Sequence, residues 1–324
     1  MGSLELLQNG VWSYRASGRT RHYRLCENYV GPNVCNWAIP EEESHSLCRS
    51  CRLTQVVPDL ERPGFREAWY KLEVAKRRLV YTLEELNCFV KSAAEDPRGV
   101  AYEFLADPTE PDSPPVLSGH ANGVITINVA EADDAERERR RVNLREPYRT
   151  LLGHFRHESG HYYWDLLIKD TASIDEFRKL FGDERSDYGQ DLQNYYNQGA
   201  PANWQQRYVT TYASAHPWED WAETWAHYLH MVDTLESAEA CGLSLRPSRL
   251  DEPALHANLK TLHPGKSFNH LIDRWFPLTY ALNNLNRGMG LIDAYPFVLS
   301  TPAVEKLNFV HNSIHSLSAE KQTA

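Results

Sequence analysis

Two histidines and a glutamate in the order His157-Glu158-x-x-His161 are the residues of this chain whose types and spacing are best suited to chemistry. Histidines four positions apart on a helix lie on the same face, so both imidazoles can reach one tetrahedral zinc ion. The glutamate between them then sits where it can hold a water molecule and take its proton. The pattern therefore predicts a hydrolytic zinc centre, with the two histidines as metal ligands and Glu158 as the general base.

The residues around this pattern favour a catalytic helix over a chance match. Phe155, Tyr162 and Leu166 recur at helical spacing and form an apolar stripe. The alternative function is a latent or non-catalytic zinc protein that acts as a binding or regulatory module. A purely structural zinc site has no need of a water-holding base, so Glu158 favours an enzyme that hydrolyses peptide bonds.

A catalytic zinc usually takes three protein ligands and keeps one position for water, so a further ligand is required. The residues that directly follow the pattern do not supply it. Trp164 and Leu167 stand where a metzincin would have a glycine and a third histidine. Asp165 lies on the same helix after His161 and would point farther along it, away from the metal.

The best candidate region for the third ligand lies between residues 212 and 230. Polar residues there recur at helical spacing on one face that is flanked by tryptophans: Glu219, Glu223, His227 and His230. Such a polar face is unusual in a core helix. If Glu219 binds the ion, Glu223 one turn later can accept the N–H of a ligating histidine and fix its tautomer.

A second candidate metal site lies near the start of the chain, where four of the six cysteines are crowded together: Cys26, Cys35, Cys48 and Cys51. Four thiolates in so short a segment predict a compact structural zinc site, because the segment could bury little surface without a metal. The first pair is spaced more widely than usual. The alternatives are therefore thiols without a metal, or His22 or His45 in place of a cysteine. The clustering also favours a reducing compartment over a disulfide scaffold.

The sequence also predicts the elements that position these residues. Apolar residues at helical spacing indicate helices over residues 65–79, 147–168, 174–181 and 218–237. The capping-box pattern Thr82-x-x-Glu85 predicts the start of another helix, and the largely helical C-terminal third is expected to break at Pro277 and Gly288. Asn122-Gly123 between β-favouring runs predicts a hairpin. We therefore expect an α+β fold, mainly helical, with a small sheet before the catalytic helix.

Composition limits the classes of partner. The chain has 324 residues, a formal net charge of −10 and 42% hydrophobic residues. An acidic chain disfavours nucleic acid, since phosphate contacts need clustered lysine and arginine. No apolar run is long enough to span a membrane, and the first residues lack a secretory signal. We therefore expect a cytoplasmic protein whose partners are peptides or proteins, and neither nucleic acid nor membrane.

The region of the third ligand resembles the glutamate helix of gluzincin peptidases. Glu-x-x-Ala-Glu-x-Trp at residues 219–225 is similar to a segment of the anthrax lethal-factor catalytic domain, where the first glutamate binds zinc. That family also carries a tyrosine seven residues before the ligand, which is Tyr212 here. The resemblance implies Glu219 as the third ligand, Glu223 as its supporting carboxylate and Tyr212 as a hydroxyl that stabilises the oxyanion.

Over nearly its whole length the chain resembles a bacterial family described as "putative zinc-binding metallopeptidases" with an N-terminal zinc-ribbon segment. The resemblance lies in the cysteine segment, in residues 119–124, 153–158 and 216–228, and in residues 286–296. Pro58 and Pro63 mark a change of composition, so we expect a zinc-ribbon-like segment at residues 1–60 and a zincin-like metallopeptidase domain at residues 61–324. We therefore expect one catalytic and one structural zinc. Ribbons of this kind often dock other macromolecules, so the segment could recruit a protein partner or cover the cleft.

Substrate contacts are expected on a strand and in the C-terminal region. In zincin-like domains a strand along the cleft pairs with the peptide backbone, and residues 123–129, with Gly123 and Ile125, are the candidate edge strand. The alternative is an ordinary core strand. His120 could contact substrate or make a structural hydrogen bond. Arg287 could grip a substrate carboxylate or form a salt bridge with Asp293.

Overall fold

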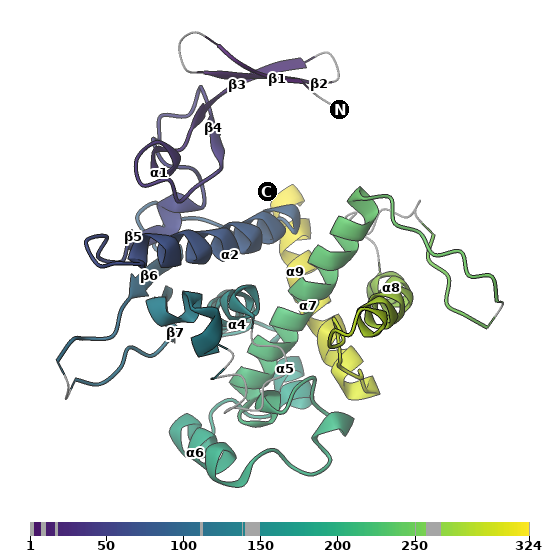
Figure 1. The fold of residues 1–324 in the computed structure, drawn as a ribbon. Helices are drawn as coiled ribbons and strands as arrows, with labels where there is room; N and C mark the ends of the chain where they lie inside the picture. The colour runs from purple at the N-terminus through teal and green to yellow at the C-terminus, as the bar shows by residue number, and fades with distance from the viewer. Residues whose placement is uncertain are drawn as a thin grey trace. The chain divides into compact units, whose positions relative to one another are not determined.

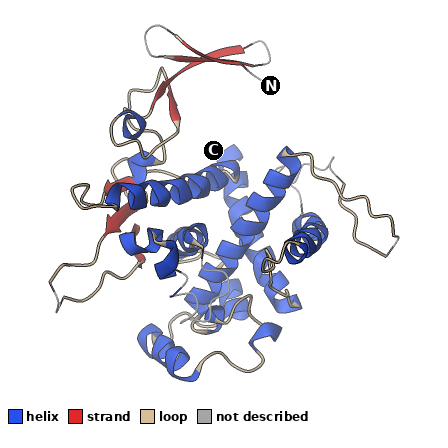
Figure 2. Ribbon diagram, in the orientation of Figure 1, coloured by secondary structure: helices blue, strands red, loops and turns tan. Residues whose placement is uncertain are grey.

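A computed structural model describes residues 3–7, 11–16, 19–110, 113–137, 139, 150–249, 251–256 and 267–323. The chain divides into two compact units, one made of residues 1–80 and 90–139 and the other of residues 81–89 and 140–324. Helices dominate, and the strands form two small sheets (Figures 1 and 2). The predicted α+β fold is confirmed.

The first sheet belongs to the cysteine segment and was not predicted. Its antiparallel strands follow one another in the order β1 (Ser3–Leu6), β2 (Trp12–Ala16), β3 (Arg19–Leu25) and β4 (Ala38–Pro40). A short helix, α1 (Glu27–Val30), follows β3, and the 3-10 helix η1 (Cys51–Leu53) closes the segment. Cysteines therefore lie at the starts of α1 and η1.

The second sheet has the strand order β5 (Thr54–Val56), β6 (Ala101–Leu105), β8 (Val124–Asn128) and β7 (Gly119–Ala121). Its hairpin confirms the prediction, since Asn122 and Gly123 have φ values of 50° and 81°, as a tight hairpin turn requires.

The predicted edge strand is wrong. β8 lies between two strands: it pairs antiparallel with β7 and parallel with β6. Both sides of its backbone are therefore occupied. The side chain of Ile125, in the middle of β8, is 0% exposed. The expected core-strand alternative therefore describes β8.

Helix α2 (Phe65–Glu85) is longer than predicted. The helix expected to start at Thr82 is wrong, because Thr82 is buried within the last turns of α2 and its carbonyl accepts the amide of Leu86 at 3.1 Å. In the first unit the buried side of α2 includes charged side chains as well as apolar ones. Lys76 is fully buried, with Nζ 2.9 Å from Oε1 of Glu73 and above the rings of Tyr102 and Phe104 in β6.

The second unit contains the helices α4 (Leu151–Leu167), α5 (Ile174–Phe181), α6 (Tyr188–Gln198), α7 (Pro217–Ala240), α8 (Phe268–Gly288) and α9 (Thr301–Thr323). The prediction for α5 is confirmed, and α7 extends beyond its predicted range. The first predicted residues of α4, 147–149, lie outside the described part. α8 ends at Gly288 as expected but continues through Pro277, so the break predicted at that proline is wrong. α6 was not predicted.

Helices α4 and α7 pack closely, and this contact sets the geometry of the site (Figure 1). Gly160 of α4 lies against Ala222 of α7; a Cβ at Gly160 would come within 2.9 Å of the Ala222 Cα. The indole N–H of Trp221 donates to the Gly160 carbonyl at 2.8 Å, and that of Trp225 donates to the Ser159 hydroxyl at 3.0 Å. The two helices are therefore fixed in register at the turn that carries the histidines.

Candidate metal centres

Three predicted ligands meet between α4 and α7. Nε2 of His157 lies 3.0 Å, and Nε2 of His161 3.6 Å, from Oε2 of Glu219. The three ligand atoms lie within 4.8 Å of one another. In a tetrahedral site with zinc bonds of about 2.0–2.1 Å, ligand atoms are separated by roughly 3.3 Å. The observed separations fit one zinc ion.

Buried atoms at this point of α4 and α7 lack the partners that an ion or water would supply. Oε2 of Glu219 and Oε2 of Glu158 are both buried and make no hydrogen bond. Leaving a buried polar atom unpaired costs about 1–3 kcal/mol, and more for a charged group. The donor set therefore fits a site for a cation, with a second carboxylate beside it.

His157 is held by a second carboxylate on its other side. Nδ1 of His157 lies 2.7 Å from Oε1 of Glu223, and the Thr210 hydroxyl donates to Oε2 of Glu223 at 2.6 Å. A carboxylate that accepts Nδ1–H leaves the Nε2 lone pair directed at the metal position. This is the arrangement expected if Glu219 is the ligand.

The electrostatics of this centre favour a positive charge. Burial alone would lower the pKa of His157, but the carboxylates of Glu219 and Glu223 raise it well above its usual range. Burial would raise the pKa of Glu219, but His161 and His157 hold it well below the usual range. A field that binds a proton this strongly also binds a metal cation.

The predicted general base is joined to a histidine that sequence reasoning missed. Oε1 of Glu158 lies 3.1 Å from Nε2 of His154, one turn earlier on α4. Burial opposes ionisation of Glu158, but this hydrogen bond and the charges of His157, His154 and His161 lower its pKa. Glu158 is therefore an ionised carboxylate with one oxygen bonded and one unpaired.

Two tyrosines lie at the same centre. Tyr212 begins the 3-10 helix η4 (Tyr212–Ser214), and its ring centroid lies 5.9 Å from that of His157. Burial and the nearby charge of Glu219 raise the pKa of Tyr212 well above its usual range, so the hydroxyl stays protonated. The Tyr188 hydroxyl donates to Oε1 of Glu219 at 2.7 Å. Tyr188 was missed, since nothing in its local sequence marks it.

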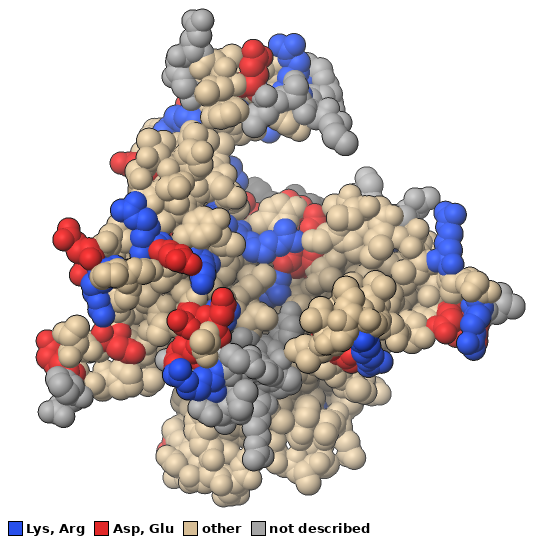
Figure 3. All heavy atoms as spheres, in the orientation of Figure 1, with Lys and Arg blue, Asp and Glu red and all other residues tan. Residues whose placement is uncertain are grey.

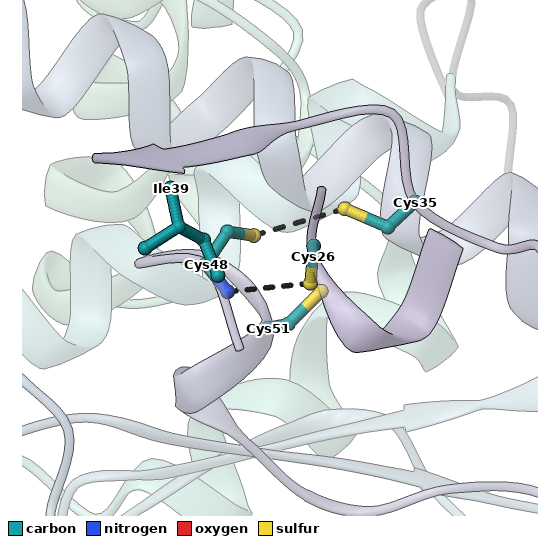
Figure 4. Close-up of a cluster of buried hydrophobic side chains, with 5 residues drawn as sticks. All are labelled: Cys26, Cys35, Ile39, Cys48 and Cys51. Atoms are coloured by element: carbon teal, nitrogen blue, oxygen red, sulfur yellow. Dashed lines mark hydrogen bonds between the residues drawn. The ribbon is translucent and has the colours of Figure 1, made fainter. Parts of the chain in front are cut away.

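The four cysteines of the first unit also converge (Figure 4). All are buried, none forms a disulfide, and Sγ of Cys35 lies 3.7 Å from Sγ of Cys48. Zinc–sulfur bonds of about 2.3 Å in a tetrahedron place sulfur atoms roughly 3.8 Å apart. The Cys48 amide donates to Cys26 Sγ at 3.2 Å, and hydrogen bonds from Cys35, Cys48 and Cys51 lower the pKa of the Cys26 thiol. The cluster fits a thiolate-bound zinc.

Neither histidine considered as a substitute ligand belongs to this cluster. Nδ1 of His22 lies 3.2 Å from a carboxylate oxygen of Glu41, and Nε2 of His45 lies 3.9 Å from one of Glu95. Both histidines are exposed. The ligand group among the described residues consists of the four cysteines.

The predicted substrate contacts have other partners within their own units. Nε2 of His120 accepts the amide of Gly123 at 3.1 Å, which closes the β7–β8 hairpin. The Arg287 guanidinium makes two hydrogen bonds to Asp293, at 2.7 and 2.6 Å. His120 thus makes the structural hydrogen bond, and Arg287 the salt bridge, that were considered as alternatives to substrate binding. Contact of either residue with substrate stays a prediction.

The surface carries charges of both signs. On the face drawn in Figure 3, acidic and basic side chains lie interspersed among uncharged ones. In the described parts of the chain, no helix combines the length and the apolar character needed to cross a membrane.

The α+β fold, the histidine–carboxylate centre and the four-cysteine cluster together indicate a zinc-binding protein of the metallopeptidase type. A family model described as "Putative zinc-binding metallo-peptidase" matches residues 65–313, and a zinc-ribbon domain model matches residues 1–62. The chain belongs to this metallopeptidase family and carries the N-terminal zinc ribbon.

Relatives are found in mycobacteria. An uncharacterized protein of Mycobacterium bovis is 43% identical over 304 residues, which cover 93% of this chain and 85% of the relative. Uncharacterized proteins of two Mycobacterium tuberculosis strains match to the same extent. No solved structure matches, so the likeness to the lethal-factor segment stays a prediction.

Proposed function

We propose that this chain is a zinc-dependent peptidase in which His157, His161 and Glu219 hold the catalytic ion and Glu158 is the general base. The observation that carries the proposal is the convergence of three ligand atoms within 4.8 Å beside the unpaired oxygen of Glu158. Family membership supports it, because the matching family is described by zinc binding and peptidase activity.

A zinc ion in this position lowers the pKa of a water molecule and polarises the scissile carbonyl. The residues of the chain perform the remaining tasks. Oε2 of Glu158 accepts a proton from the attacking water and returns it to the leaving amine, while His154 holds Oε1. The protonated hydroxyl of Tyr212 donates a hydrogen bond to the developing oxyanion.

The proposal is tested by two substitutions and a matched control. Glu158→Gln keeps the size of the side chain but cannot take a proton, so it should abolish peptide cleavage and leave zinc content unchanged. Glu219→Ala should lose the zinc of this centre. Asp165→Asn removes a carboxylate from the same helix, where Asp165 lies 3.7 Å from Lys169, and should change neither property.

Cleavage is measured by mass spectrometry of a digested peptide library, and zinc by elemental analysis. Normal cleavage by Glu158→Gln would show that the base has been misassigned. Cleavage retained after Glu219→Ala would show that peptide hydrolysis does not depend on the proposed metal centre.

The four-cysteine cluster is proposed to hold a structural zinc and to present a docking segment to a protein partner or substrate. Four buried cysteines placed to hold a metal need reduced thiols, which supports the expected cytoplasmic location. Removal of residues 1–58 should impair recognition of the natural substrate and spare zinc at the histidine–carboxylate centre. Unchanged turnover of that substrate by the shortened chain would contradict the docking role.

A further inference from the structure

Helix α6 (Tyr188–Gln198) is not held by core packing. It contains no buried residue, and Asp191 is its single charged side chain. Its ends are defined locally, because the Asp187 side chain accepts the Gln190 amide at the start and Gly199, with φ 75°, follows its last residue. A helix of this length is only marginally stable by itself. Specific side-chain contacts must therefore hold α6 against the rest of the second unit.

Two tyrosines connect α6 to the histidine–carboxylate centre. The Tyr188 hydroxyl donates to Oε1 of Glu219 at 2.7 Å. The Tyr195 ring packs edge-on against the Tyr212 ring, with centroids 5.6 Å apart. Both contacted residues belong to the candidate site, so α6 is joined to the part of the second unit where the proposed chemistry takes place.

The bond from Tyr188 makes the two oxygens of Glu219 inequivalent. Oε1 is occupied by the tyrosine hydroxyl, whereas Oε2 faces Nε2 of both His157 and His161 and makes no hydrogen bond. Glu219 is 1% exposed, so bulk solvent does not contact its carboxylate. A carboxylate with one oxygen already bonded offers a metal ion a single oxygen, which leaves room in the coordination sphere for water.

Packing accounts for the Tyr188 ring but not for its hydroxyl. The ring lies edge-on to those of His216 and Trp218, with centroids 5.1 and 5.7 Å away. A phenylalanine would make the same contacts. Tyr188 is also 38% exposed, so it is not a core residue whose hydroxyl had to find a buried partner.

We propose that Tyr188 is a positioning residue of the metal centre, which holds one oxygen of Glu219 so that only the other faces the ion. The inference rests on the proposed role of Glu219 as a zinc ligand. Because the same bond joins α6 to α7, zinc binding and the order of α6 are coupled. Zinc at this centre therefore slows amide exchange in α6.

The test uses the full-length chain with Tyr188→Phe, which removes the hydroxyl and keeps the ring. Zinc affinity is measured by competition with a chromophoric chelator, and the Glu219→Ala chain identifies which part of the signal belongs to this centre. Loss of a hydrogen bond to a metal ligand typically weakens binding by about 10- to 100-fold, and we expect at least tenfold here. In the cobalt-substituted protein the visible absorption bands should change shape, which a purely structural loosening would not cause.

Tyr196→Phe is the matched control, since it removes a hydroxyl from the same helix that contacts Tyr212 and not Glu219. It should keep the wild-type zinc affinity and cobalt spectrum. Hydrogen exchange of the unaltered chain gives an independent measurement: zinc should protect residues 188–198, and Glu219→Ala should remove that protection.

Equal zinc affinity and equal cobalt spectra for Tyr188→Phe and Tyr196→Phe overturn the inference, as does zinc-independent exchange in α6. These readouts do not depend on turnover. A chain that binds zinc through Glu219 but cleaves no peptide would refute the peptidase proposal, and the role of Tyr188 would still be decided.

Discussion

The two ring nitrogens of His157 have separate tasks, and this division explains why one histidine needs two carboxylates. Nδ1 lies 2.7 Å from Glu223 and Nε2 lies 3.0 Å from Glu219. A proton on Nδ1 satisfies the first carboxylate and leaves Nε2 as the lone-pair donor. Glu223 in turn accepts the Thr210 hydroxyl, so its orientation is fixed from the far side.

Glu223→Gln should weaken zinc binding at the histidine–carboxylate centre. The amide oxygen can still accept the His157 N–H while the amide NH2 turns toward the Thr210 hydroxyl, but the bond to His157 is no longer charge-assisted and orients the ring more weakly. We expect the zinc affinity to fall by about tenfold or more, as measured by chelator competition. Glu236→Gln, on the same helix but bonded to Tyr81, is the control and should bind zinc normally. An unchanged affinity for Glu223→Gln would mean that Glu223 does not orient His157.

The buried side chain of His227 makes the free energy of unfolding depend on pH. Burial lowers the pKa of His227 from its ordinary 6.5 to about 4; the charge of Glu223 opposes this shift and that of Arg156 reinforces it. Between these values the unfolded chain binds a proton that the folded chain does not. The free energy of unfolding therefore falls as the pH is lowered from 6.5 to 4, by up to about 3 kcal/mol from this group.

The measurement compares wild type with His227→Gln by urea denaturation of the metal-free chains across that range. Other groups titrate in both proteins, so the difference between the two curves isolates His227. The substitution also removes the contact of His227 with the Tyr295 hydroxyl, at 2.7 Å, which lowers stability by a constant amount. Parallel curves would contradict the prediction.

At the residue scale, the sequence identified side chains that share a local pattern and missed those whose partners are distant. His157, Glu158 and His161 stand together in one motif, and the glutamate face was visible from helical spacing. Tyr188 was not predicted, because its role depends on a hydrogen bond to Glu219, 31 residues farther along the chain. His154 was overlooked for a different reason: it lies one turn before Glu158, where the spacing alone could have suggested a contact.

Among the elements, the pair α4 and α7 determines whether the site exists. His157 and His161 come from one helix and Glu219 from the other, so a change in the distance between the axes separates the ligand atoms. Gly160 allows the close approach, with the Ala222 backbone where a side chain would otherwise stand.

Gly160→Ala should therefore damage both the fold and the metal centre. The added methyl group would meet the Ala222 Cα at 2.9 Å, so the helices must shift. Overpacking of this kind typically costs about 1–3 kcal/mol, and the shift should also reduce zinc affinity. Gly288→Ala is the control, because a Cβ there meets nothing within 4 Å at the end of α8. Denaturant unfolding and zinc titration check both effects; wild-type values for Gly160→Ala would show that the helix contact is more tolerant than the geometry implies.

Predictions of elements succeeded where apolar spacing was regular. The range of α5 and the β7–β8 hairpin were predicted because each has a complete local signal. α6 was missed although Tyr188, Leu192 and Tyr195 recur at helical spacing, because most of its other residues are glycine, aspartate, asparagine and glutamine, which are typical of loops. The edge strand was wrong because strand order depends on pairing between distant segments: β6 pairs with β8, although β7 lies between them in the sequence. The sequence of a single strand does not contain that information.

For the whole molecule, the two candidate metal sites lie in different compact units. The four cysteines belong to the first unit, and His157, His161 and Glu219 to the second. The family models divide the chain at a different place, between residues 1–62 and 65–313, so residues 65–80 and 90–139 share a compact unit with the ribbon but match the peptidase model. The division at residue 60 into a ribbon and a peptidase domain stays a prediction, and it implies that each metal can be removed without the other.

Replacement of Cys48 and Cys51 by serine in the full-length chain should lower the zinc content by about one equivalent per chain, because serine is a poor ligand for zinc and the site is folded by its metal. The remaining zinc should be the portion that Glu219→Ala removes, so a chain with all three substitutions should hold none. Limited proteolysis should then cut within residues 1–60 of the serine variant and leave α4 to α9 protected, since these helices and the histidine–carboxylate centre lie in the second unit, which has its own core. Loss of both metals in the cysteine variant would instead mean that the second unit requires the ribbon in order to fold. That result would contradict a two-domain organisation, because it would mean that the structural zinc stabilises the entire chain.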